Sequence, residues 1–303
     1  MFYETKTTSG ETGNYVNRIW IGNWDYETTI REIMPNTNIC VLLQLGNIPN
    51  YKIIDKEFIK NTPLDFNEWH NKISNEAIFV GNAIIGPHRD MIAELSHGNT
   101  YTIGIEFKTG VSHKFFGIPI KELANNIMPL QNANGLLSNI FKQINTNNNN
   151  EIFVSLQNFI EDKIMGSPFC NIQNENINNL IRTIDQNPFI HNVNELSELY
   201  CTSRRNLNRL FNEYTGLSAQ QYIMIEKIKQ MANLMIEHSE YSLNDIIALC
   251  NYQDQSHLNR DTKQLGGLTA TTIYQKIHDR LSYMPSPLAM NLMEGVYCGL
   301  HLH

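Results

Sequence analysis

The chain has 303 residues, of which 42% are hydrophobic and 17% are charged, and its formal net charge is −7. This length accommodates two domains with ordinary hydrophobic cores, and the composition is typical of a folded, soluble protein. No run is typical of a secretory signal or long enough to span a bilayer, and the five scattered cysteines include no metal-like pair, so we expect a protein of the reducing cytoplasm with no membrane partner.

The first hundred residues predict β structure. The candidate strands are 15–21, 28–34, 39–45, 77–84 and 100–107. They are short, rich in Ile, Val, Tyr and Phe, and separated by turns that contain Gly, Asn and Pro. The run TYTIGI at 100–105 alternates polar and apolar residues, as in a sheet with one buried face. Together they favour a small barrel or sandwich.

From Pro119 the pattern indicates helices. Pro119 suits a first helical turn, and Ile120, Leu123, Ala124 and Ile127 recur at helical spacing. Further helices are predicted at 136–144 and 152–164, with the polar connection NTNNNN at 145–150 between them. Gly-Ser-Pro at 166–168 ends this part, so the domain boundary is placed near residue 170, and a helix at 177–184 opens the second half.

Patterns that would indicate an enzyme are missing from the sequence. The histidines of the first half show no ligand spacing, and a turn after Gly86-Pro87 accounts for the proximity of His88 and Asp90. No nucleophile motif, phosphate-binding glycine loop or pair of catalytic carboxylates is recognisable. We therefore expect no catalytic residue, no metal and no cofactor. The terminal run His-Leu-His at 301–303 has metal-like spacing but lies on an apolar tail, 282–303.

The stretch 193–218 predicts a short helix, a tight turn and a second helix. On a helical wheel the second helix places one polar group on one face: Arg205, Asn208, Arg209 and Asn212. Its other face is apolar: Leu207, Leu210, Phe211 and Tyr214. Thr202 or Ser203 can cap its start, and Gly216 can end it in the left-handed conformation. This is the pattern of a helix-turn-helix that offers Arg and Asn to base edges in a major groove.

The stretch 243–269 repeats this layout with one extra residue in the turn. Leu-Asn-Arg at 207–209 matches Leu-Asn-Arg at 258–260, and Gly-Leu-Ser at 216–218 matches Gly-Leu-Thr at 267–269. The matching polar face of the second copy consists of Ser256, Asn259, Arg260 and Lys263. A single copy is weak evidence, but two tandem copies with matched exposed residues are hard to obtain by chance.

Residues 175–278 resemble the DNA-binding domain of AraC-type transcription regulators. The resemblance is carried by the run 207–211, by 216–218 and Tyr222-Ile223, and in the second copy by Ile246, Tyr252, Gln255-Ser256, Leu258, Arg260, Lys263 and Gly267. It implies two helix-turn-helix units joined by a linker helix at about 218–237. The chain departs from the family at Ile247, Asn251, Thr262 and Ala270, where Ala, Gly, Phe and Pro are usual. The second unit is therefore expected to have the thinner core.

The first half is similar, more loosely, to the sensor-like domain found ahead of such DNA-binding domains. The segment 104–130, together with 15–20, carries this likeness. It implies a cupin-like β-barrel followed by helices that pair two subunits. No residue matches a known ligand-binding motif, so the resemblance names no effector.

The net charge is unusual for a nucleic-acid binder, but cations crowd one short helix at Arg204, Arg205 and Arg209. A positive face is needed only where the phosphates lie. The candidate DNA-binding residues are Arg204, Arg205, Asn208, Arg209, Asn212, Gln255, Ser256, Asn259, Arg260 and Lys263. The arginines have the fork geometry for guanine edges or phosphates, the asparagines suit adenine, and Ser256 suits a phosphate.

These observations predict a two-domain α+β transcription regulator that binds double-stranded promoter DNA. A β-barrel sensor-like or dimerisation domain occupies 1–170, a double helix-turn-helix domain 171–281, and a tail 282–303. A small-molecule effector, a homodimer and RNA polymerase remain open as further partners. Two alternatives also stay open: a cupin-type barrel enzyme fused to a DNA-binding domain, and a dimerisation module without ligand.

Overall fold

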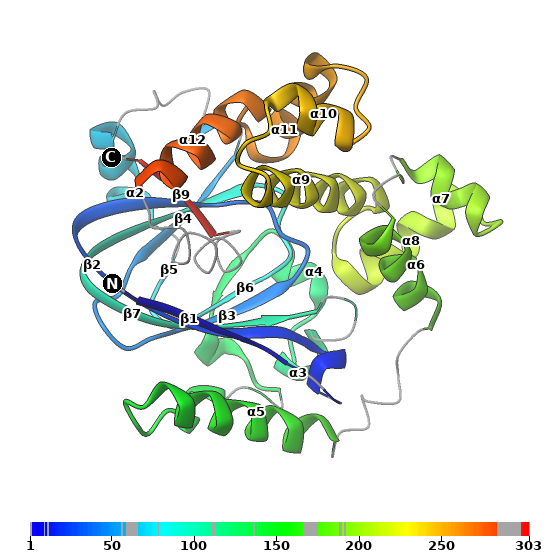
Figure 1. Ribbon diagram of the computed structural model, residues 1–303. Coiled ribbons are helices and arrows are strands. Elements are labelled where there is room, and N and C mark those ends of the chain that lie inside the picture. The colour runs from blue at the N-terminus through cyan, green and yellow to red at the C-terminus, as the bar shows by residue number, and fades with distance from the viewer. Residues whose placement is uncertain are drawn as a thin grey trace.

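Figure 1 shows the protein as a computed structural model. The structure describes residues 2–8, 10, 12–55, 57–58, 66–77, 79–108, 110, 113–135, 137, 139–165, 175–187, 190, 192–283 and 298–302. We refer to the described residues up to 165 as the N-terminal half, and to residues 175–283 as the C-terminal half.

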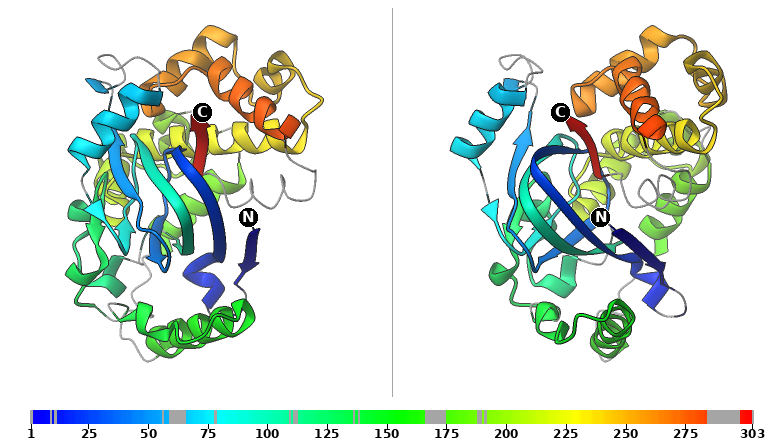
Figure 2. Two further views of the ribbon diagram at one scale, coloured as in Figure 1. Left: turned by 90° about the vertical axis from the view of Figure 1, so that its left-hand side faces the viewer. Right: turned by 60° about the vertical axis from the view of Figure 1, so that its left-hand side comes forward.

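An antiparallel sheet forms most of the N-terminal half. Its centre is the pair of long strands β2 (Val16–Ile33) and β7 (Met91–Phe107). The other strands are β1 (Phe2–Thr7), β3 (Ile39–Gln44), β4 (Asn50–Ile54), β5 (Phe79–Val80), β6 (Ala83–Ile85), β8 (Ile127–Pro129) and β9 (Cys298–Leu302). The order is β1-β2-β7-β3-β6-β8, with β4 also paired to β7 and β9 to β2. A register shift between Tyr26 and Thr29 lets β2 bend, so the sheet curves strongly (Figure 2).

The predicted α+β class is confirmed, but the sheet is open and does not close into the predicted barrel. Among the described strands, β1 and β8 lie at opposite ends of the hydrogen-bonded order and do not pair with each other. Closure depends on such an edge-to-edge ladder, which strand composition does not reveal.

Most predicted strands are present, with changed boundaries. The strands predicted at 39–45 and 100–107 correspond to β3 and to the second part of β7. Those predicted at 15–21 and 28–34 form the single strand β2, because a register shift takes the place of the expected turn. The one predicted at 77–84 is divided into β5 and β6.

Helices cover the sheet. They are α2 (Phe66–Glu76), α3 (His113–Phe116), α4 (Ile120–Leu123) and α5 (Asn149–Met165), with 3-10 turns η1 (Thr12–Asn14), η2 (Leu130–Asn132) and η3 (Ile140–Gln143). The helix predicted at 152–164 is confirmed as α5. The one predicted at 136–144 is wrong as an α-helix, since its described part contains only η3, and residues 136 and 138 lie outside the described residues.

The helix predicted from Pro119 through Ile127 stops at Leu123. Ala124 leaves the helical region with ψ of 130°, and Asn125 has a left-handed φ of 53°. Ile127 then begins β8, which pairs with β6. The apolar residue that continued the helical spacing is therefore buried as part of a strand, because the edge of β6 accepts its backbone hydrogen bonds.

The C-terminal half is helical, as predicted. Its helices are α6 (Glu175–Gln186), α7 (Val193–Leu199), α8 (Arg204–Thr215), α9 (Ala219–Glu237), α10 (Leu243–Leu249), α11 (Gln255–Gly266) and α12 (Ala270–Tyr283). The helix predicted at 177–184 is α6, and the predicted linker is α9, capped by Ser218. The boundary placed near residue 170 lies outside the described residues, and so do residues 284–297 of the predicted tail 282–303. The first two residues of that tail end α12, and 298–302 form β9 on the second part of β2.

The two halves share one hydrophobic core. One buried cluster contains Ile30, Met34 and Trp69 of the N-terminal half together with Tyr222 and Ile225 of α9. All three tryptophans are buried, Trp69 in this cluster and Trp20 and Trp24 in a separate one within the N-terminal half. A second cluster packs the sheet against α3, α4 and α5. The helical half is therefore joined to the sheet by packed apolar side chains.

Candidate nucleic-acid interface

The helices of the C-terminal half form two helix-turn-helix units: a first unit of α7 and α8, and a second unit of α10 and α11. Ser203 caps α8 by accepting from the Asn206 N–H, and Asp254 caps α11 by accepting from the His257 N–H. Gly216 and Gly267 end these helices with left-handed φ values of 71° and 74°. The predicted stop residues are thereby confirmed.

The turns also match, including the predicted extra residue. Cys201 and Asn251, each two residues past the end of its preceding helix, have left-handed φ values of 46° and 55°. Thr202 alone separates Cys201 from the cap of α8, whereas two residues separate Asn251 from the cap of α11. The repeat seen in the sequence is therefore a repeat of backbone conformation.

The predicted polar face of α8 lies toward solvent at three of its four residues, and the neighbouring candidate Arg204 is exposed as well. Arg204, Arg205, Arg209 and Asn212 are exposed, and Asn208 is half-buried. Asn208 Oδ1 accepts a hydrogen bond of 3.1 Å from the Ala219 N–H in the first turn of α9. Its carbonyl oxygen is thus used within the protein, whereas a bidentate contact with adenine needs both the oxygen and the amide nitrogen.

Arg209 lies at the centre of this face and is held by weak contacts. Its Nη1 is 2.8 Å from Glu213 Oε2, and its Nη2 donates to Asn206 Oδ1 at 3.1 Å. The Arg209 and Glu213 side chains are 60% and 51% exposed. An ion pair this exposed contributes at most about 1 kcal/mol, so a phosphate or guanine could replace the carboxylate at small cost.

The polar face of α11 is arranged in the same way. Gln255, Ser256, Arg260 and Lys263 are exposed, and Gln255 Nε2 donates to Thr271 Oγ1 at 2.8 Å. Asn259 occupies the position of Asn208 and is also half-buried. Its Oδ1 is buried and has no hydrogen-bond partner among the described residues. The side-chain oxygen of Asn208 therefore accepts a hydrogen bond within the protein, whereas that of Asn259 does not.

The core of the second unit contains polar groups where the first has apolar ones. Phe211 is fully buried and packs on Tyr222, with ring centroids 5.2 Å apart. At the matching position Thr262 is 1% exposed, and its hydroxyl donates to the Asn259 carbonyl. Tyr252 Oη donates to Asp261 at 3.2 Å. Burial, with the Asp261 carboxylate next, raises the pKa of Tyr252.

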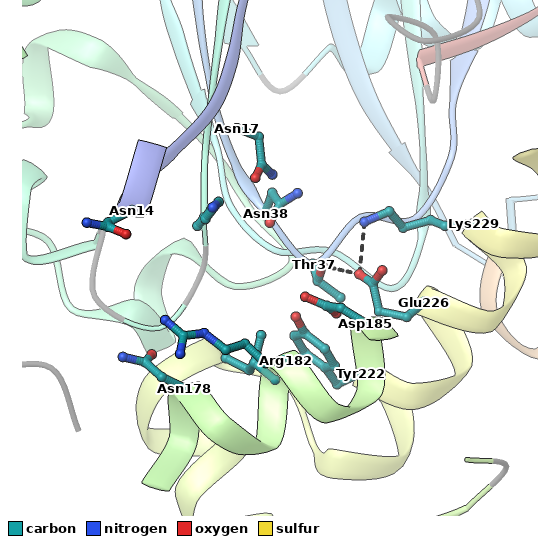
Figure 3. Close-up of a pocket in the computed structure, with 12 residues that line it drawn as sticks. Asn14, Asn17, Thr37, Asn38, Asn178, Arg182, Asp185, Tyr222, Glu226 and Lys229 are labelled. Carbon is teal, nitrogen blue, oxygen red and sulfur yellow. Dashed lines mark hydrogen bonds and ion pairs between the residues drawn. The ribbon is translucent and has the colours of Figure 1, made fainter. Parts of the chain in front are cut away.

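Helix α9 joins the two units and also connects the halves by polar contacts (Figure 3). Glu226 Oε1 accepts a short hydrogen bond from Thr37 Oγ1 and lies 2.9 Å from Lys229 Nζ. These side chains face a cavity of about 200 Å³ that Asp185 of α6 and Tyr222 also line. Two carboxylates and an ammonium group thus meet at the junction of the halves.

This cavity perturbs its ionisable groups. Burial, and secondly the Glu226 carboxylate, raises the pKa of Asp185 to about 7, against the opposing effect of Lys229 and Lys108. Burial disfavours the charged form of Lys229, but Glu226 and Glu106 outweigh it and raise the pKa of the amine. Asp185 can therefore take up a proton near neutral pH while Lys229 stays charged.

A second ion pair joins α12 to the sheet. Glu32 of β2 is fully buried, and its Oε2 lies 2.5 Å from Lys276 Nζ, whereas Oε1 has no partner among the described residues. Burial raises the pKa of Glu32, and Lys276 opposes it. The sequence analysis missed this pair and the one on α9. A charged residue amid the apolar face of a long helix, such as Glu226, was the available signal.

His88, the histidine that lies close to Asp90 in the sequence, has a structural role. It is buried, and its ring nitrogens lie 2.9 and 3.0 Å from the carbonyl oxygens of Gly86 and Met34. No group of three or more His, Cys, Asp or Glu side chains among the described residues could hold a metal ion. No helix among the described residues is long and apolar enough to cross a membrane.

The geometry defines a double helix-turn-helix module whose second helices present cations and amides to solvent. Residues 196–276 match the family model described as a helix-turn-helix domain, and residues 11–129 match that of a domain of unknown function (DUF6597). The C-terminal half therefore carries an AraC-type helix-turn-helix domain, as DNA-binding transcription regulators do, and the resemblance drawn for residues 175–278 is confirmed; the N-terminal half matches a domain of unknown function.

Solved structures of ToxT from Vibrio cholerae are similar in overall fold. One at 1.65 Å is 9% identical, with a TM-score of 0.47 over 90% of this chain and 98% of that one. Another, of ToxT bound to (E)-4-(8-methylnaphthalen-1-yl)but-3-enoic acid, is 12% identical, with a TM-score of 0.45 over 90% and 98%. No curated protein is significantly similar in sequence. The assignment above depends on the matched domains and on the geometry of the two units.

Proposed function

We propose that the protein is a sequence-specific regulator that places α8 and α11 in two successive major-groove segments of promoter DNA. The observation that carries this proposal is the conformational repeat of the two units, with exposed Arg205 and Arg209 on one and Arg260 and Lys263 on the other. Matched units of this kind contact segments about one helical turn apart.

Within this interface we assign the main base contacts to Arg205 and Arg209. Both guanidinium groups are exposed and have the fork geometry for guanine O6 and N7. Asn208 is assigned a positioning role through its hydrogen bond to Ala219, and Asn259 retains an unpaired oxygen that could turn toward DNA.

The N-terminal half is proposed to control this binding through α9. Glu226 of α9 accepts a hydrogen bond from Thr37, between β2 and β3, and pairs with Lys229 of the same helix, so a change in the sheet reaches the helix that spaces the two units. The cavity of about 200 Å³ at this junction is a place where a small polar effector would alter those contacts. An effector should raise the unfolding temperature of the full chain.

Selection of bound sites from random DNA tests the proposal. The full chain should enrich a site with two half-sites about ten base pairs apart. Arg209→Ala should then weaken binding by about 1–3 kcal/mol and relax preference at one base position. Lys163→Ala on α5, also an exposed cation, is the control. If no sequence were enriched, or if Arg209→Ala left affinity and preference unchanged, the assignment of α8 to the groove would be wrong.

A further inference from the structure

A groove of about 490 Å³ lies beside the contact between α4 of the N-terminal half and the C-terminal end of α8. The polar side chains that line it are those of Arg89, Lys121, Asn125, Asn212 and Gln221, and none of the described residues lines it with a carboxylate. Asn212 belongs to the candidate DNA-binding face of α8. The groove therefore continues that face onto the N-terminal half, with two cations of the N-terminal half beside it.

The loop that carries Arg89 is held by its own hydrogen bonds. Asn125 Oδ1 accepts from the N–H groups of Arg89 and Asp90 at 3.2 and 3.3 Å, and its Nδ2 donates to Asp90 Oδ2 at 2.9 Å. The Asp90 side chain is only 11% exposed, whereas that of Arg89 is 52% exposed. The loop is thus anchored, and the Arg89 guanidinium group, whose Nε lies 3.3 Å from Asp90 Oδ2, remains about half exposed to solvent.

Close backbone packing keeps the groove against α8. A Cβ atom at Gly216 would lie 2.4 Å from Ala124 Cβ and 3.1 Å from the Ile120 carbonyl oxygen. Only a glycine fits between α8 and α4 at this distance. Lys121 follows Ile120 directly on α4, so its position relative to α8 is set by this contact.

We propose that Arg89 and Lys121 bind the DNA phosphate backbone alongside the segment read by α8, so that the DNA interface includes the N-terminal half. This inference rests on the proposed function. Cations and amide donors around a groove without carboxylates are the groups that position a phosphate chain. The contact would also give an acidic chain positive charge where the phosphates lie.

A second hollow next to this groove indicates on which side of Arg89 the DNA phosphate backbone passes. It also borders Arg89 but contains the carboxylates of Asp55, Glu57 and Asp90, and it faces α9 and Gln264 of α11. Phosphates are repelled there and attracted in the groove at α8. Glu57→Gln, which removes an exposed carboxylate of this hollow, should therefore strengthen DNA binding slightly, opposite to the effect of removing Arg89.

The test uses the full chain and the site selected by the unaltered protein. Each phosphate contact contributes about 0.9 to the slope of log affinity against log salt, equivalent to about fivefold in affinity at 0.15 M. Arg89→Gln together with Lys121→Gln should therefore lower the slope by about 1.8 and the affinity by about 30-fold. The loss should be the same on the selected site and on random DNA, because phosphates carry no sequence information.

The matched control is Lys142→Gln together with Lys163→Gln, which removes two exposed cations on η3 and α5, at the far end of the sheet from α10–α12 (Figures 1 and 2). This variant should bind DNA like the unaltered chain, and both double variants should keep its thermal unfolding curve. If the Arg89 and Lys121 double variant bound DNA as tightly as the unaltered chain at every salt concentration, the inference would be overturned. Tighter binding, or a loss confined to the selected site, would do so too. Arg209→Ala, with its changed base preference, shows separately whether α8 reads DNA.

Discussion

The buried ion pair between Glu32 and Lys276 should contribute strongly to the docking of α12 on the sheet. Lys276→Met keeps an apolar stem of similar length and removes the charge, so the fully buried Glu32 carboxylate loses the cation 2.5 Å away. Its second oxygen already has no partner among the described residues. Breaking a buried pair on one side typically costs about 3–5 kcal/mol, and we expect that loss of unfolding free energy at pH 7.

The pH dependence of this loss follows from the pKa of Glu32. Burial raises that pKa above the ordinary 4.5, and Lys276 opposes the rise. Lys276→Met therefore moves the native pKa higher, and the carboxyl then binds its proton more tightly in the folded than in the unfolded chain. The cost of the substitution should be full above the raised pKa, shrink as the pH falls toward 4.5, and vanish below it.

Urea unfolding at pH 7 and pH 5 measures both effects. The three tryptophans lie in the N-terminal half, so their fluorescence reports on the sheet, while far-UV circular dichroism reports mainly on the helices. Adding Glu32→Gln to Lys276→Met should recover most of the loss. Glu213→Gln, which breaks the exposed pair with Arg209, should cost less than about 1 kcal/mol. A loss below 1 kcal/mol for Lys276→Met, or one that is equal at both pH values, would refute the reasoning.

Three further outcomes are expected. In the free protein, amide hydrogens across 254–265 should exchange faster than those across 203–214, because the second unit buries Thr262 where the first buries the ring of Phe211; equal or slower exchange would contradict this. The carboxyl of Asp185 has a pKa of about 7 in the folded chain against 3.8 when unfolded, so the folded chain binds its proton more tightly. The free energy of unfolding should therefore fall as the pH rises between these two values, and Asp185→Asn should flatten that dependence. Gly216→Ala should lower stability by more than the roughly 1 kcal/mol of a left-handed alanine, and Ala124→Gly should restore part of the loss; no restoration would count against the contact between α4 and α8.

The helix-turn-helix units could be predicted because their signals are local. Ser203 caps α8 through an N–H three residues away, and Gly216 ends the same helix by its own left-handed conformation. The polar and apolar faces of a helix follow from its period alone. Each of these features depends on residues within one or two turns, and the tandem repeat then made their combination specific.

Predictions that required a distant partner were less accurate. Ile127 continued a helical spacing, but it lies in β8 because the edge of β6 was available to pair with it. The barrel was predicted from strand composition, whereas closure depends on whether β1 meets β8, and in this structure they do not pair. Neither outcome can be obtained from the residues of one segment.

The sequence by itself thus determined the two units, their caps, the linker helix and the exposed cations, since these follow from neighbouring residues. The tertiary structure decided which of the polar residues remain available to DNA. Asn208 has the right residue type and the right helix position, but its oxygen is bound by α9. The tertiary structure also brought Glu226 to Thr37 and Arg89 to the end of α8, because packing between the halves joins residues that lie far apart in the chain.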